Sequence, residues 1–374
     1  AHNLRKIMDE IFGPENFIAN IIWQKVYAPK SSALYFSEDH DYIMVYTKNK
    51  EKWRPEPLPR TEGQDSVYKN PDNDPRGPWR PNNLAARNYY SKGTYSITCP
   101  GGRIIDGPPS GSYWRISKEK LEELDADGRI YWGENGNNVP APKIFLSEVR
   151  NGRVPQTFWS YKEVGHTQEA KRELLKRLDF ESSETVFDTP KPTKLIQQML
   201  RIGTKPDQND IILDFFAGSA TLGDAVMQLN AEDEGNRRYI LAQIPEQTEA
   251  DDYVTITDMA KARLRAASQS IKEECDANNK GQNESSFPDI GFQVFKLSDS
   301  NIRPWAPEAD HLDDSLFDSI ENIKADRTEN DVLYELLLKY GLDLSVPIEQ
   351  RAIESRNVYI VGAGALVVCL ADDI

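Results

Sequence analysis

The chain has 374 residues, enough for two or three domains of roughly 100–200 residues each. It carries 45 basic and 60 acidic residues, a formal net charge of −15, which excludes uniform electrostatic attraction to a polyanion. No apolar run approaches the ~18 residues of a membrane-spanning helix, so we expect no membrane association. The three cysteines are far apart and histidines number four, so we expect neither disulfides nor a metal site, and a reducing cytoplasm as the compartment.

The acidity is concentrated late in the chain. Residues 201–374 contain 16 basic and 33 acidic residues, whereas residues 51–160 contain 16 basic and 14 acidic residues. This middle segment also holds five of the seven tryptophans, and it is rich in Pro and Gly. Arginines interleaved with aromatic residues predict a loop-rich segment that contacts nucleic acid. The alternative is an irregular β insert whose tryptophans form its own core.

Apolar periodicity predicts the elements of the first half. A helix is expected at residues 3–12, followed by strands at 17–26 and 41–47. The continuous apolar character of these strands is typical of a parallel sheet covered by helices on both faces. After the short pieces of residues 51–160, helical periodicity returns at residues 168–177 and 193–202.

The second half begins with a clear strand–turn–helix pattern at residues 211–226, and a second strand is predicted at residues 238–244. An amphipathic helix at residues 258–272 precedes a polar linker at residues 276–289. Beyond the linker we expect a strand near residues 291–297, a helix at 332–340 that ends at Gly341, and a C-terminal hairpin (VYIVGAGALVVCL).

The turn at residues 214–221 (DFFAGSAT) follows a strand, at the edge where α/β sheets bind ligands. Its small residues allow a nucleoside to approach the backbone, and Asp214 can accept hydrogen bonds. The alternative is that the glycine of this turn serves packing alone. The turn has neither the GxGxxG pattern nor the GK[ST] ending of a phosphate loop. The next strand ends in Gln243-Ile-Pro-Glu246, where a polar side chain can bind ribose hydroxyls.

Several motifs, in a fixed order, carry a resemblance to a known family. The segments DTPKP (residues 188–192), TKLIQQML, LDFFAGSAT and RRYILAQIPE resemble the cofactor motifs of S-adenosylmethionine-dependent DNA methyltransferases that act on exocyclic amines. In the β class of these enzymes the target-recognition region precedes the cofactor motifs, as residues 51–160 precede them here. With IWQK, HDYIMVYTK, VGHTQEAK and GFQVFKLSDSNI, the chain resembles the modification (Mod) subunit of type III restriction–modification systems over essentially its whole length.

The resemblance implies a Rossmann-like α/β methyltransferase sheet with an inserted, loop-rich target-recognition domain and a small C-terminal α+β region. Residues 1–50 and 161–275 would form the methyltransferase domain, residues 51–160 the insert, and residues 276–374 an incomplete C-terminal region. The implied reaction is methyl transfer from S-adenosylmethionine to the exocyclic amine of adenine in double-stranded DNA. The implied partners are an ATP-dependent restriction subunit and a second Mod subunit.

The resemblance also assigns site residues. The cofactor would be held by Asp188, Pro190, Lys191, Asp214, Phe215, Ala217, Gly218 and Thr221, with the ribose bound by either Gln243 or Glu246. For DNA contact we consider Arg103, Trp114, Arg115, Arg129, Trp132 and Lys143, with solvated or acid-paired arginines as the alternative.

Two departures from the family pattern bear on function. Ala220 replaces a glycine of the family turn DFFAGSGT, and its methyl group is expected to narrow the cofactor approach. The D-P-P-[YFW] loop that holds the flipped base is absent, since the only Pro-Pro pair lies in Asp106-Gly-Pro-Pro-Ser110 within the insert. In the family this loop precedes the helix with which this chain opens, so we expect residue 1 to follow a missing part and the chain alone to lack turnover.

Two other functions remain open from the sequence. The chain could be a non-catalytic DNA-recognition or interaction module, which DNA binding independent of the cofactor would indicate. An RNA or small-molecule methyltransferase would share the fold, but it does not explain the long insert. His166 is expected to cap or pack a helix rather than act in acid–base catalysis.

Overall fold

The computed structural model describes residues 2–149, 152–178, 180, 189–248, 252–278, 288–303 and 323–371. The chain divides into two compact units, Ala1–Ile290 and Gly291–Ile374. Both contain helices and short strands, so the protein has a mixed α/β fold. Within the described ranges, no helix has the length and apolarity needed to cross a membrane.

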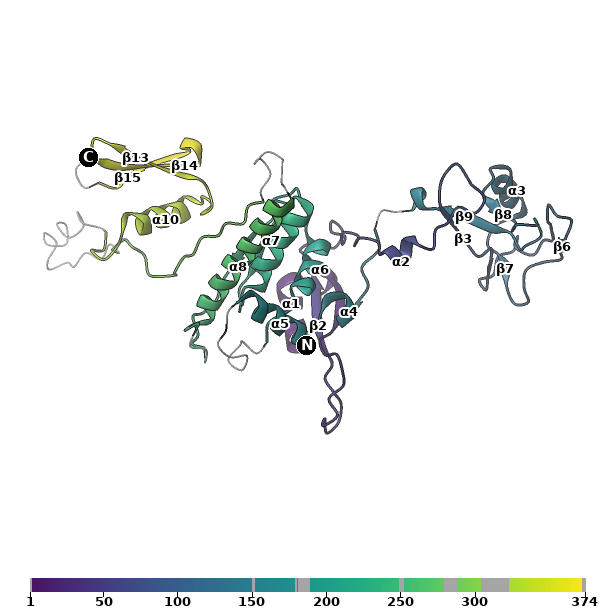
Figure 1. Cartoon of the computed structure of the whole chain (residues 1–374), viewed down its shortest axis with the longest axis horizontal. Helices are drawn as coiled ribbons and strands as arrows, with labels where there is room; N and C mark the ends of the chain where they lie inside the picture. The colour runs from purple at the N-terminus through teal and green to yellow at the C-terminus, as the bar shows by residue number, and fades with distance from the viewer. Residues whose placement is uncertain are drawn as a thin grey trace. The chain divides into compact units, whose positions relative to one another are not determined.

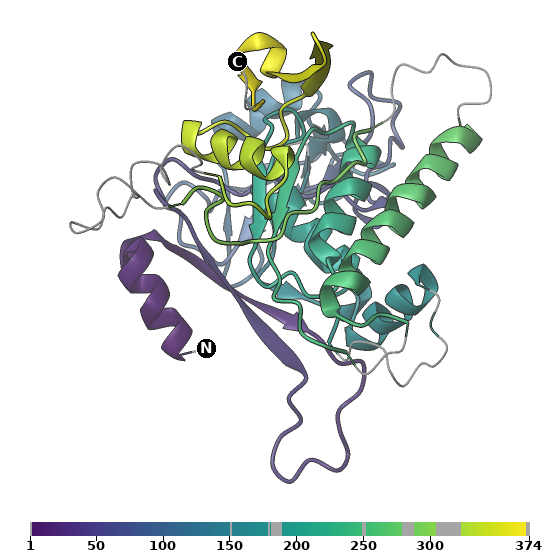
Figure 2. The same ribbon diagram turned by 90° about the vertical axis from the view of Figure 1, so that its left-hand side faces the viewer.

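The first sheet has the strand order β10–β1–β2. It follows helix α1 (His2–Phe12) and the short 3-10 helix η1 (Pro14–Asn16), and its strands are β1 (Phe17–Gln24), β2 (His40–Tyr46) and β10 (Phe158–Trp159). β1 is parallel to β10 but antiparallel to β2, so the prediction of a parallel sheet is wrong for the β1–β2 pair. The connection between β1 and β2 contains no crossover helix, and a chain without one returns antiparallel. This connection projects beyond the sheet (Figure 2).

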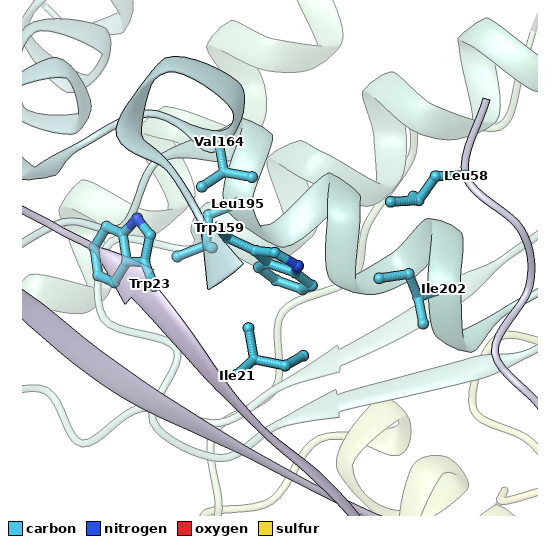
Figure 3. Close-up of a cluster of buried hydrophobic side chains, with 7 residues drawn as sticks. All are labelled: Ile21, Trp23, Leu58, Trp159, Val164, Leu195 and Ile202. Carbon is cyan, nitrogen blue, oxygen red and sulfur yellow. The ribbon is translucent and has the colours of Figure 1, made fainter. Parts of the chain in front are cut away.

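One hydrophobic core joins segments that are far apart in the sequence. Trp23 and Trp159 lie on the adjacent strands β1 and β10, and the indole N–H of Trp23 donates to the carbonyl of Gly165 at 3.0 Å. These side chains pack with residues of α4 (Tyr161–Val164) and α6 (Thr193–Gly203), as Figure 3 shows. The segments on either side of residues 51–160 therefore share one core.

The second sheet consists of two parallel strands, β11 (Ile211–Asp214) and β12 (Arg238–Leu241). They are connected by helix α7 (Thr221–Asp233), which lies beside α8 (Ile256–Asn278) in Figure 1. Ile212 and Tyr239 pack toward α6 and α7, whereas alternate side chains on the opposite face are more than half exposed, namely Ile211, Leu213 and Ile240. The described elements thus cover one face of this sheet.

Residues between β2 and β10 form short strands, as their broken apolar pattern predicts. The elements are α2 (Glu62–Asp65), β3 (Trp79–Pro81), β4 (Ala85–Ala86), β5 (Ile97–Thr98), β6 (Ile104–Ile105), β7 (Tyr113–Trp114), α3 (Lys118–Ala126), β8 (Ile130–Tyr131), β9 (Ala141–Phe145) and the 3-10 helix η2 (Leu146–Glu148). They pair as β3–β9–β8, β4–β7 and β5–β6. Their own core is made of Leu84, Ile97, Trp114, Leu121 and Ile130.

The unit Gly291–Ile374 contains helix α10 (Glu329–Tyr340) and an antiparallel sheet of β13 (Ile348–Ile353), β14 (Arg356–Val361) and β15 (Leu366–Cys369), with the 3-10 helix η3 (Gly362–Gly364) between the last two. The predicted helix and C-terminal hairpin are confirmed. The strand expected near residues 291–297 is wrong, because residues 288–303 contain no strand and Leu297 is almost fully exposed. β13 was not predicted, because its apolar residues do not alternate with polar ones and most of its side chains are exposed.

Candidate functional site

The turn at residues 214–221 connects β11 to α7 and has two left-handed positions. Gly218 has φ 52° and Ala220 has φ 60°. The first suits glycine, whereas the second imposes a conformation that L-residues rarely adopt. Ala220 is fully buried, so its methyl group packs inside the turn and does not narrow the approach from solvent, contrary to expectation.

The turn is joined to the end of the neighbouring strand. The N–H of Gly218 donates to Gln243 Oε1 at 2.8 Å, and Gln243 Nε2 donates to the carbonyl of Ile244 at 3.1 Å. Asp214 Oδ1 accepts from the N–H of Phe216 at 3.1 Å, and its second oxygen has no hydrogen-bond partner among the residues that the structure describes. Glu246 is exposed at the same edge of the sheet. Gln243 therefore supports the turn, while Asp214 and Glu246 present carboxylate oxygens.

Two phenylalanines beside the turn are exposed to solvent. Phe215 is 67% exposed and Phe216 is 79% exposed, with their ring centroids 5.2 Å apart. Ala217 and Thr221, in contrast, are buried and shape the turn from within. An exposed aromatic ring beside a tight turn is a surface on which a planar base can stack.

The predicted Pro190–Lys191 segment precedes α6. Pro190 is buried, Lys191 is exposed, and Lys191 Nζ lies 5.7 Å from the ring centroid of Trp23. The next polar residue, Thr193, donates through its backbone N–H and its hydroxyl to Glu173 Oε2, both at 3.0 Å. Asp188, the first residue of this predicted motif, lies outside the described residues.

A buried charged residue lies beneath the turn. Arg263 of α8 is fully buried, and its guanidinium donates to Asp224 Oδ2, Thr221 Oγ1, Ser219 Oγ and Thr193 Oγ1 at 2.9–3.3 Å. Arg263 was not among the residues predicted from the sequence. A signal was present, because Arg263 stands four residues from both Met259 and Ala267 on the buried side of an amphipathic helix.

Within the insert, two of the predicted DNA-contacting cations are bound to carboxylates. Lys143 is 9% exposed and lies 2.5 Å from Asp72 and 2.8 Å from Asp74. Hydrogen bonds from Arg76 and Lys143 hold the pKa of Asp74 well below its usual range.

Arg129 is the second of these cations. It donates to both oxygens of Glu148 at 2.6 and 2.8 Å and to Asp127 at 2.6 Å. The hydrogen bonds from Arg129 lower the pKa of Glu148. Arg129 and Lys143 thus act first as internal ion-pair partners of the insert.

The predicted aromatic contacts differ in exposure. Trp114 is fully buried in the core of the insert, where its indole N–H donates to the carbonyl of Tyr95 at 2.9 Å, so it has no surface to offer to DNA. Trp132 is partly exposed and donates to Asp125 Oδ1 at 2.6 Å. Trp114 therefore belongs to the core of the insert, as the alternative to DNA contact predicts.

Arg103 and Arg115 are exposed on the insert. Arg103 donates to the carbonyl of Asn137 at 3.1 Å. Neither arginine pairs with a carboxylate in the part of the chain that the structure describes. The Asp106–Ser110 segment follows β6 in the same insert.

His166 caps α5 (Thr167–Arg177) by accepting from the N–H of Glu169 at 3.2 Å, which confirms its predicted capping role.

The chain is similar in sequence to known DNA-modifying proteins. It is 31% identical to the type III restriction–modification enzyme StyLTI Mod subunit of Salmonella typhimurium (strain LT2) over 79% of this chain and 43% of that protein. It is 29% identical to the EcoPI Mod subunit of Escherichia phage P1 (63% of this chain, 39% of that protein). It is 26% identical to the type II methyltransferase M.EcaI of Enterobacter cloacae (58% and 43%).

The chain therefore spans about two fifths of the length of these three relatives. A family model described as DNA methylase matches residues 1–267, which include the turn, the insert and Arg263. This chain belongs to the DNA methylase family.

Proposed function

We propose that the chain is the cofactor-binding and DNA-recognition part of a methyltransferase that transfers a methyl group from S-adenosylmethionine to the exocyclic amine of adenine, as the Mod component of a type III restriction–modification system. The observation that carries the proposal is the joined edge of β11 and β12. There Gly218 and Gln243 connect the two strand ends and leave Asp214 and Glu246 available to a ligand. Ligands of open α/β sheets bind at this edge.

The residues of this edge fit the proposed cofactor. Glu246 would accept hydrogen bonds from the ribose hydroxyls, because the oxygen of Gln243 is already bonded to Gly218. Asp214 would accept from polar N–H groups, and Phe215 would pack against the adenine. Ala217 and Thr221 would keep the turn in shape, and Asp188, Pro190 and Lys191 would close the site from the preceding segment.

When bound, S-adenosylmethionine would supply a methyl group activated by its attachment to a sulfonium. The part of this chain would be to bind the cofactor, orient it and exclude water from it. The D-P-P-[YFW] loop that would hold the flipped adenine has no counterpart in this sequence, so we expect binding without turnover by this chain alone.

For DNA, we propose contact through Arg103 and Arg115, with Trp132 beside them, while Trp114, Arg129 and Lys143 stabilise the insert from within. Similarity to Mod subunits supports a restriction subunit and a second Mod subunit as partners. Three free cysteines support a location in the reducing cytoplasm.

Calorimetric titration with S-adenosylhomocysteine tests the cofactor proposal. We expect saturable binding by the wild-type chain and a loss of at least about tenfold in affinity for Asp214→Ala, because a charged acceptor is removed. The matched control is Asp207→Ala. Asp207 is an exposed carboxylate that precedes β11, at the end of the strand away from the turn, so this variant should bind like the wild type. Absence of binding by a chain that shows a cooperative thermal transition would contradict the proposal and leave DNA recognition as the activity to test.

A further inference from the structure

The buried guanidinium of Arg263 contacts two stretches that are far apart in the sequence: residues 219–224, which include the end of the cofactor turn and the first turn of α7, and Thr193 at the start of α6. Its Nη1 donates to Thr221 Oγ1 at 2.9 Å and to Ser219 Oγ at 3.3 Å, both in the cofactor turn. Its Nη2 donates to Thr193 Oγ1 at 3.0 Å, directly after the Pro190–Pro192 segment. Its Nε donates to Asp224 Oδ2 at 2.9 Å in the first turn of α7. One side chain thus connects the cofactor turn to the residue that directly follows the Pro190–Pro192 segment.

The groups around Arg263 are themselves buried and bonded. Asp224 is 1% exposed and also accepts from Gln228 at 2.6 Å and from Arg177 at 3.4 Å. The Thr193 hydroxyl accepts from Arg263 and donates to Glu173, so the network extends to α5. Two arginines are balanced by two carboxylates, which is the condition under which buried charges are tolerated.

The arrangement requires the geometry of arginine. A guanidinium directs its donors outward from a rigid plane, so it can reach the turn, α7 and α6 at the same time. A lysine ammonium is a compact point donor on a flexible stem, and it can neutralise Asp224 without reaching both Thr193 and Ser219. Because Arg263 is fully buried, it cannot contact a ligand itself.

From these contacts we infer that Arg263 is a positioning residue: it fixes the cofactor turn against the start of α6, so that the two motifs face the cofactor in one fixed arrangement. This inference rests on the proposed function for its consequence on cofactor affinity. The network itself is independent of any ligand. A buried ion pair adds little net stability over apolar packing, so fixing geometry is the contribution that we assign to it.

The chain contains a matched control at the other end of α7. Arg237 is also buried, and it donates to both oxygens of Asp233 at 2.9 Å and to Thr204 Oγ1 at 2.7 Å. It joins a carboxylate and a threonine hydroxyl as Arg263 does, but among the described residues it forms no hydrogen bond with the turn at residues 214–221. Arg237→Lys therefore removes a comparable buried network without affecting the site.

The test compares Arg263→Lys with Arg237→Lys in the full chain. Amide hydrogen exchange should accelerate by at least about tenfold at residues 216–221 and 193–196 in Arg263→Lys, because these segments lose charged hydrogen bonds. In Arg237→Lys the acceleration should occur at residues 230–237. S-adenosylhomocysteine affinity should fall by at least about tenfold in Arg263→Lys and by less than about twofold in Arg237→Lys.

A third variant separates stability from positioning. Arg263→Met leaves Asp224 without its main partner and should lower the midpoint of thermal unfolding strongly. Compared with Arg263→Met, Arg263→Lys should restore most of the thermal midpoint but not the cofactor affinity. If Arg263 had a purely structural role, both the midpoint and the affinity would be restored together. The inference is overturned if exchange at residues 216–221 is unchanged in Arg263→Lys, or if Arg237→Lys loses as much affinity. If the wild-type chain does not bind S-adenosylhomocysteine, the proposed function fails, and the exchange data alone still decide the role of Arg263.

Discussion

Ala220 occupies a left-handed position, with φ 60° and ψ 36°, at the start of α7. Such a conformation costs an L-residue about 1–2 kcal/mol, which glycine would avoid. Glycine would in turn lose a buried methyl group, worth about 0.8 kcal/mol, and would have more freedom in the unfolded chain, worth about 0.4–1 kcal/mol. The two effects nearly cancel, so the alanine is tolerated in this turn.

We therefore predict that Ala220→Gly changes the free energy of unfolding by less than about 1 kcal/mol. The control is Ala225→Gly, which removes an equally buried methyl group from the interior of α7. It relieves no strain and should cost about 2 kcal/mol. Urea unfolding followed by tryptophan fluorescence measures both changes, and equal losses in the two variants would show that Ala220 is not strained.

The arginines of the insert differ in their partners, and this difference predicts their effect on DNA binding. Arg103 and Arg115 are exposed and have no carboxylate partner among the described residues. Arg103→Ala and Arg115→Ala should each weaken binding and reduce the slope of log affinity against log salt by about one, the value for one lost phosphate contact.

Arg129→Ala should instead lower the thermal midpoint and leave the salt slope unchanged, because Arg129 is paired with Asp127 and Glu148. Binding of a DNA duplex across a range of salt concentrations measures these slopes. If Arg129→Ala reduces the slope as much as Arg115→Ala does, the internal role assigned to Arg129 is wrong.

At the scale of elements, α10 shows how a helix is fixed to the segment before it. Glu335 of α10 accepts from Ser300 Oγ at 2.5 Å, from the N–H of Asn301 at 2.6 Å and from Lys339 Nζ at 2.8 Å. Burial opposes ionisation, but these hydrogen bonds outweigh it and lower the pKa of Glu335 to about 2. Ionised Glu335 therefore stabilises this unit.

The sign of the pH dependence follows from this lowered pKa. A carboxylate whose pKa is depressed in the folded state contributes stability above its unfolded pKa, about 4.3, and loses it as pH falls toward the folded value. Glu335→Gln should cost on the order of 2 kcal/mol at about pH 6, and this cost should shrink by more than half at about pH 3. Amide exchange in α10 at both pH values measures the difference, and a cost independent of pH would contradict the lowered pKa.

The whole molecule consists of two compact units, each with a hydrophobic core of its own. Residues 291–374 have a core of their own, made of residues from α10, β14 and β15 such as Leu333, Tyr359 and Val368. All residues of the proposed cofactor site that the structure describes lie in the first unit.

We predict that a chain ending at Ile290 binds S-adenosylhomocysteine within about twofold of the full chain, because it keeps every described residue of the proposed cofactor site. Calorimetric titration of the two chains, with a thermal transition for each, provides the measurement. A much weaker affinity of the shorter, folded chain would show that the second unit contributes to the site.

Local sequence patterns were enough to predict β11, α6, α10, the hairpin β14–β15 and the turn at residues 214–221. These follow from short-range periodicity and turn chemistry, which neighbouring residues encode. The motif order also indicated the family that the match over residues 1–267 confirms.

Which polar groups come into contact could be seen only in the folded chain. Arg263 reaches Thr193 across 70 positions, and Lys143 reaches Asp74 across 69, distances over which no local pattern acts. The antiparallel return of β2, the burial of Trp114 and the bond between Gly218 and Gln243 were decided in the same way. The energy of these contacts depends on segments that meet only when the chain has folded, so residue type alone could not distinguish a supporting arginine from an exposed one.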